Sequence, residues 1–96
     1  MVKDPTSIPA IAKRLLATRQ ALGLSQVEVS RKIKISPRAW NNYELGRRRP
    51  ELDTALLMRK QLGISLDFIY AGEEVKTSSD LKRRIDLHLR DNRRGL

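Results

Sequence analysis

Two short helices and a tight turn are encoded by residues 25–46, SQVEVSRKIKISPRAWNNYELG. Ser25 and Glu28 have the spacing of a capping box, in which each side chain accepts a hydrogen bond from the other residue's backbone N–H. This pattern predicts a helix over about residues 26–33. Apolar and polar residues alternate in 27–29 and 33–35 as they do in strands, but each run has only three residues. The helical caps around both runs favour the helix.

A second helix is predicted over about residues 37–45. Ser36 is a favourable N-cap, and Pro37 suits the first helical position because a backbone N–H is not needed there. Trp40 and Tyr43 are three residues apart and therefore share one face. With these two aromatic side chains directed inward, the spacing is that of a helix-turn-helix unit, although an α-hairpin in any helical bundle would show a similar pattern.

The rest of the chain also shows helical spacing. Apolar residues predict helices over 8–22, with Lys13, Arg14 and Gln20 facing outward, from Pro50 to Gly63, with Leu52, Ala55, Leu56 and Leu62 buried, and from Ser65 to about Gly72. After a polar stretch, Ser78, Ser79 and Asp80 resemble a cap for a last helix with Leu81, Ile85 and Leu89 on one side. That thin apolar stripe indicates either weak docking or a surface for a partner.

The composition restricts the function. The 96 residues include 20 Lys or Arg and 11 Asp or Glu, a net charge of +9, which favours a polyanionic partner. There is no cysteine and only one histidine, so we expect no metal site, no cofactor and no catalytic residues. No apolar run approaches the roughly 20 residues of a membrane span, and we expect no enzymatic activity, no membrane partner and a cytoplasmic location.

Residues 24–69 resemble the Cro/C1-type, lambda-repressor-like helix-turn-helix family, also called the XRE family. The resemblance rests on Gln26, on Ser36 in the turn, and on three later motifs: Tyr43-Glu44-Leu45-Gly46, Pro50 with Leu52, and 62–67, LGISLD. With the first helix included, it covers about residues 8–72. The chain departs from the family at Ser30, where alanine is usual, and at Lys34, where glycine is usual and a left-handed backbone is therefore expected.

The resemblance implies a fold class: an all-α, five-helix lambda-repressor-like DNA-binding domain, here with an additional short C-terminal helix. The expected organisation is an N-terminal arm (1–7), the helix-turn-helix domain (8–72) and a basic C-terminal tail (73–96) that is partly helical. The implied function is sequence-specific binding of double-stranded DNA as a transcriptional regulator, expected to be a repressor and a homodimer. The alternative is an antitoxin-type protein that binds a toxin partner and regulates its own operon.

The resemblance also implies roles for individual residues. Arg38, Asn41 and Asn42 lie opposite the aromatic face, where arginine suits guanine and asparagine suits adenine. In the family the positions of Pro37, Arg38 and Asn42 face base edges, and Asn41 lies nearby. Phosphate contacts are implied for Gln26 and for the arginine run Arg47, Arg48 and Arg49.

A structural ion pair between Arg19 and Glu44 is implied as well. A carboxylate near the end of a helix is disfavoured by the helix dipole, so a cationic partner for Glu44 would explain its presence.

Overall fold

The computed structural model describes residues 4–73 and 79–94, except for the side chains of residues 79, 93 and 94. This part of the chain holds six α-helices and no strand. The helices are α1 (Ile8–Leu22), α2 (Gln26–Lys32), α3 (Pro37–Glu44), α4 (Leu52–Leu62), α5 (Leu66–Ala71) and α6 (Ser79–Arg94). The predicted all-α fold class is confirmed, and the residues that alternate like strands lie in α2 and in the turn after it. At 16 residues, α6 is longer than the short helix expected.

Side-chain caps begin the helices of the helix-turn-helix unit where the sequence predicts them. Both hydrogen bonds of the capping box are present, from Glu28 N to Ser25 Oγ (3.0 Å) and from Ser25 N to Glu28 Oε1 (2.8 Å). Ser36 caps α3, where its Oγ accepts from the backbone N–H of Ala39 at 3.1 Å, and Pro37 follows in the first turn. These local bonds satisfy backbone donors that a helix start otherwise leaves unpaired.

Lys34 lies in the turn between α2 and α3 with a left-handed backbone, φ 63°. It is the position at which the family usually has glycine. A side chain with a Cβ costs about 1 kcal/mol in this conformation. The turn nevertheless forms, because Lys34 N and Ile35 N donate to carbonyls of Arg31 and Ser30 at 3.2 and 3.0 Å.

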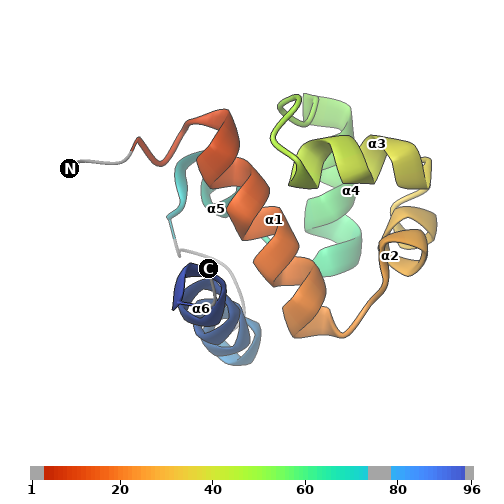
Figure 1. Ribbon diagram of the computed structural model, residues 1–96. Coiled ribbons are helices and arrows are strands. Elements are labelled where there is room, and N and C mark those ends of the chain that lie inside the picture. Colours follow the sequence, from red (N-terminus) through yellow and green to blue (C-terminus); the bar gives the residue numbers. More distant parts are fainter. Residues whose placement is uncertain (1–3, 74–78, 95–96) are drawn as a thin grey trace.

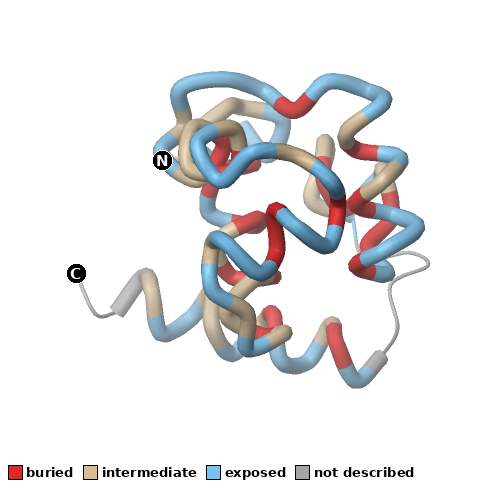
Figure 2. The backbone as a smooth tube through the Cα atoms, turned by 90° about the vertical axis from the view of Figure 1, so that its right-hand side faces the viewer, coloured by how far each residue is buried: buried red, intermediate tan, exposed pale blue. Residues whose placement is uncertain are grey.

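The helices surround one core, with α1 in the middle of the molecule. Helix α1 packs against α3, α5 and α6, while α3 also packs against α2 (Figure 1). Figure 2 shows buried and exposed positions following one another along the helices, as expected of amphipathic helices that share a core. The largest fully buried side chain is that of Trp40, and Tyr43 is buried beside it in the same cluster.

Helix α6 lies alongside α1, on the side of α1 away from α3 (Figure 1). Leu81 and Ile85 are buried in the common core, Leu89 packs against it, and Asn92 Nδ2 donates to Gln20 Oε1 on α1 at 2.8 Å. These apolar side chains are thus covered by the chain itself, which corrects the interpretation of this stripe as a surface for a partner. The proposed cap at Ser78 and Ser79 falls outside the described side chains.

Arg14 is buried, with 8% of its surface exposed, although the sequence predicts that it faces outward. Its Nη2 donates to the carbonyls of Pro5 (2.5 Å) and Ile69 (3.0 Å), which ties the segment before α1 to α5. Burial lowers the pKa of this guanidinium. Helical spacing could not predict this position, because the acceptors come from distant segments.

Two leucines predicted to be buried in α4 are exposed. Leu52 is 59% exposed and Leu56 is 36% exposed, whereas Ala55, Met58 and Leu62 form the buried side of the helix. The inward face is thus rotated from the predicted one. Among the described helices, none combines the length and the apolar character that crossing a membrane requires.

Candidate nucleic-acid interface

The turn between α2 and α3 is held by apolar side chains from both helices. Val29 and Ile33 on one side and Trp40 on the other are fully buried, and Ile35 in the turn packs against the same cluster. Because these side chains are close-packed, α3 has one orientation relative to α2. The opposite face of α3 is therefore presented to solvent as a rigid surface.

This outward face carries the side chains predicted to contact bases. Pro37 and Arg38 are exposed, and Asn41 and Asn42 are half-buried. Leu45, which follows α3, is 55% exposed. The helix thus presents one cation, two amides and two apolar surfaces, a set that matches the chemistry of base edges in a major groove.

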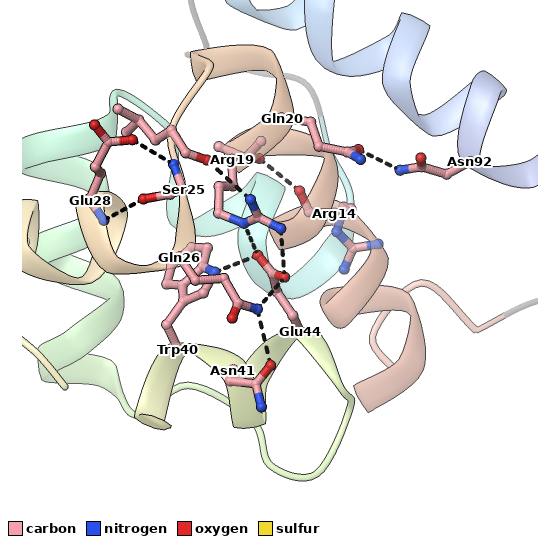
Figure 3. A network of polar contacts seen from close by, with 12 residues as sticks. Arg14, Arg19, Gln20, Ser25, Gln26, Glu28, Trp40, Asn41, Glu44 and Asn92 are labelled. Carbon is pink, nitrogen blue, oxygen red and sulfur yellow. Dashed lines mark hydrogen bonds and ion pairs between the residues drawn. The ribbon is translucent and has the colours of Figure 1, made fainter. Parts of the chain in front are cut away.

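Glu44, the last residue of α3, is the centre of a polar network (Figure 3). Its side chain is 6% exposed, and the carboxylate forms an ion pair with Arg19 of α1, with Nε to Oε2 at 2.5 Å and Nη2 to Oε1 at 3.1 Å. Trp40 Nε1 also donates to Oε2, and Gln26 Nε2 donates to Oε1 at 3.0 Å. The network therefore joins α1, α2 and α3 behind the outward face.

Burial and hydrogen bonding act in opposite directions on Glu44. Burial raises the pKa of the carboxyl, but hydrogen bonds from Arg19, Gln26 and Trp40 and the charge of Arg19 lower it, with a net pKa below the usual 4.5. Glu44 is accordingly ionised near neutral pH and acts only as an acceptor.

Gln26, predicted to contact a phosphate, lies at the start of α2 with its amide turned toward α3. Its Nε2 donates to Asn41 Oδ1 and to Glu44 Oε1, both at 3.0 Å (Figure 3). Both hydrogens of this amide nitrogen are used within the protein, so the side chain offers only its carbonyl oxygen to a ligand.

The three arginines after α3 are exposed, and each has a different contact. Arg47 Nη1 donates to Asn42 Oδ1 at 3.3 Å, Arg48 Nη2 pairs with Glu51 Oε1 at 2.8 Å, and Arg49 Nη2 donates to the backbone carbonyl of Thr6 at 2.7 Å. The Arg48–Glu51 pair is a surface ion pair, which is worth about 0 to 1 kcal/mol and is easily exchanged for another anion.

Positive charge is concentrated around the turn and α3. Residues 31–49 contain seven basic residues and one acidic residue, a net charge of +6. The acidic residue is Glu44, whose charge is compensated by Arg19, so the exposed side chains of this segment are cationic without an acidic neighbour inside it. Such a surface attracts a polyanion.

Most contacts of this region were not predicted from the sequence, and two of them differ in whether a sequence signal exists. The Trp40–Glu44 hydrogen bond has the i, i+4 spacing of neighbouring side chains on a helix, which is a signal that could have revealed it. The contact of Arg49 with Thr6 links segments 43 residues apart, and nothing in the sequence indicates it. Within residues 4–73 and 79–94, no three His, Cys, Asp or Glu side chains gather as a metal site requires.

Comparisons with known proteins agree with this geometry. The helix-turn-helix family matches residues 15–69. The chain is similar to a protein of Bacillus subtilis (strain 168) named "HTH-type transcriptional regulator ImmR", with 34% identity over 74 residues, or 75% of this chain. The chain spans 58% of the length of that relative. No solved structure matches the chain. From its matched residues and its α2–turn–α3 unit, the chain belongs to the Cro/C1-type helix-turn-helix (XRE) family.

Proposed function

We propose that the protein binds double-stranded DNA in a sequence-specific manner and regulates transcription. The observation that carries this proposal is the outward face of α3, where Arg38, Asn41 and Asn42 stand beside one another on a helix fixed by its buried aromatic side. An α-helix fits the major groove of B-DNA, and these side chains have the hydrogen-bonding groups that distinguish base pairs there. A DNA partner also implies a cytoplasmic location.

The basic segment after α3 supplies the second part of the interface. Arg47, Arg48 and Arg49 are exposed where α3 ends, so they would meet phosphates while α3 lies in the groove. Phosphate contacts determine affinity and orientation, whereas base contacts determine sequence preference. As a repressor, the protein would occupy an operator and exclude polymerase from it.

Selection of bound duplexes from a random pool tests the base-reading role. We expect an enriched site, and for a homodimer an inverted repeat with half-sites about 34 Å apart. A pool that remains random after several rounds would contradict sequence-specific binding.

A salt titration tests the electrostatic role on the enriched site. The logarithm of the association constant should fall linearly with the logarithm of the salt concentration, by about 0.9 per phosphate neutralised. A slope near zero would remove the arginine segment from the proposed interface.

An antitoxin-type interaction protein is the second candidate function. It is favoured by Leu52 and Leu56, which lie four residues apart on α4 and leave an apolar surface exposed. A homodimer could cover the same surface with a second copy. Sedimentation of the wild type and of a Leu52→Ser, Leu56→Ser double variant separates these cases. If the wild type is a dimer and the double variant is a monomer, the surface is covered by a second copy of the chain. A monomeric wild type that selects no DNA sequence supports the interaction protein.

A further inference from the structure

The direction of the Asn41 amide is determined by a chain of hydrogen bonds that begins at Glu44. An ionised carboxylate only accepts hydrogen bonds, so the group of Gln26 that faces Glu44 must be its NH2. That nitrogen lies 3.0 Å from Glu44 Oε1. The charge on Glu44 therefore selects one of the two possible orientations of the Gln26 amide.

The same nitrogen imposes an orientation on Asn41. After one hydrogen of Gln26 Nε2 is donated to Glu44, the other is directed at Asn41, and a donor requires an acceptor there. Asn41 accordingly presents its Oδ1 to Gln26 at 3.0 Å. Figure 3 shows the amide nitrogen of Asn41 on the far side, directed away from the network. Asn41 thus directs two N–H donors toward a ligand, while its oxygen is directed at Gln26.

Asn42 is oriented in the same sense by a different neighbour. Its Oδ1 accepts from Arg47 Nη1 at 3.3 Å, so its oxygen is directed at a donor of the protein. Arg38, exposed on the same helix, carries donors only. Arg38 and the amide nitrogens of Asn41 and Asn42 therefore present hydrogen-bond donors, while both amide oxygens are directed at donors within the protein.

We propose that α3 recognises guanine, rather than adenine, at the base pair that Asn41 faces. Guanine presents two acceptors in the major groove, N7 and O6, whereas adenine presents the acceptor N7 beside the donor N6–H2. Asparagine pairs with adenine in a bidentate manner only if its oxygen and its nitrogen both face the base edge, and here the oxygen of Asn41 is directed at Gln26 instead. This inference rests on the proposed DNA-binding function and specifies the class of site that the protein binds.

The test begins with selection from a random duplex pool by the wild type and by Asn41→Ala, since the position that loses its preference in the variant is the one that Asn41 reads. Dissociation constants are then measured for duplexes with guanine, adenine or 7-deazaguanine at that position. We expect adenine and 7-deazaguanine each to weaken wild-type binding by at least about fivefold, the low end of the discrimination that such contacts provide.

A second experiment removes the hydrogen bond that orients the Asn41 amide. Gln26→Met has a side chain of similar length that cannot donate to Asn41, so the preference for guanine over adenine should fall toward one. Gln61→Met is the matched control, because Gln61 is exposed on α4, and it should retain the wild-type ratio. Circular dichroism tests whether both variants are folded. If Gln26→Met is unfolded, the inference is decided by the dissociation constants of the wild type for the three duplexes.

The outcomes are distinct. If the wild type selects adenine at the position whose preference is lost in Asn41→Ala, the inference is overturned while DNA binding stands. The same holds if Asn41→Ala and the wild type select the same sequences, because Asn41 then reads no base. A pool with no enrichment would overturn the proposed function and this inference together.

Discussion

The guanidinium of Arg19 on α1 holds the carboxylate of Glu44 at the end of α3 through two hydrogen bonds, at 2.5 and 3.1 Å. The two side chains are 19% and 6% exposed, so the pair is largely shielded from water. A contact of this kind does more than add attraction between two helices. It keeps a buried charge compensated, and that charge in turn orients the amides in front of it.

Removing the carboxylate should be costly. Glu44→Ala leaves Arg19, Trp40 Nε1 and Gln26 without their common acceptor, and unpaired buried groups of this kind cost about 2 to 4 kcal/mol. For a domain of this size, the melting temperature should fall by more than roughly 8 °C. Glu51→Ala is the control, since Glu51 belongs to the exposed pair with Arg48, and its melting temperature should change little. Equal melting curves for both variants would refute the structural role of Glu44.

Acid should weaken the fold through the same residue. Because hydrogen bonds hold the folded-state pKa of Glu44 below 4.5, its stabilisation is present above that value. It is lost as the pH falls through the folded-state pKa, since the unfolded chain then binds the proton more readily. We expect the difference in unfolding free energy between the wild type and Glu44→Gln to shrink from about pH 6 to about pH 3. Urea unfolding at several pH values measures it, and a constant difference would contradict the depressed pKa.

Lys34→Gly should stabilise the protein. Glycine adopts a φ of 63° without the steric clash of a Cβ atom, and the lysine side chain is exposed, so its removal loses no buried contact. We expect the free energy of unfolding to rise by about 0.5 to 1 kcal/mol. Lys60→Gly is the contrasting control within α4, where glycine should cost about 1 kcal/mol. Denaturant midpoints measure both changes, and a loss of stability in Lys34→Gly would mean that the left-handed turn is not strained.

Ile85→Ala tests whether α6 is part of the core. Ile85 is fully buried, and truncation of such a side chain to alanine costs about 2 to 5 kcal/mol. Leu87 lies on the same helix but is 48% exposed, so Leu87→Ala should cost less than about 0.5 kcal/mol. If the two variants unfold at the same denaturant concentration, α6 does not contribute its buried side to the stability of the domain.

On the proposed interface, two arginines should behave differently. Arg38→Ala should weaken binding to the selected site by about 1 to 3 kcal/mol and relax the preference at one position. Arg48→Ala should weaken binding to all sequences alike and reduce the salt slope by about 1. Titrations on the selected site and on an unrelated duplex distinguish the two patterns, and a uniform loss in both variants would remove Arg38 from base reading.

Much of the fold could be predicted because its signals are local. A cap such as Ser25 with Glu28, or Ser36 with Pro37, satisfies backbone donors within one turn, so the residues that start a helix are neighbours in sequence. The unusual backbone of Lys34 was likewise expected, from the glycine that the family has in the turn. Burial was less predictable: Leu56 lies on an apolar stripe by spacing but is exposed, because the arrangement of neighbouring helices determines which side of α4 is covered.

The contacts that give this surface its chemistry depend instead on residues distant in sequence. Arg14 is buried because a carbonyl 55 residues away on α5 accepts its hydrogen bond, and the apolar side of α6 is covered because α1 lies beside it. Residue types alone allow Asn41 to face DNA with its oxygen or with its nitrogen. The direction follows from Glu44 and Gln26, which meet Asn41 only when α2 packs across α3. The positions of the helices could thus be predicted from short-range backbone requirements. Whether the outward face presents donors or acceptors is decided only in the folded molecule, because a hydrogen bond needs both partners in place.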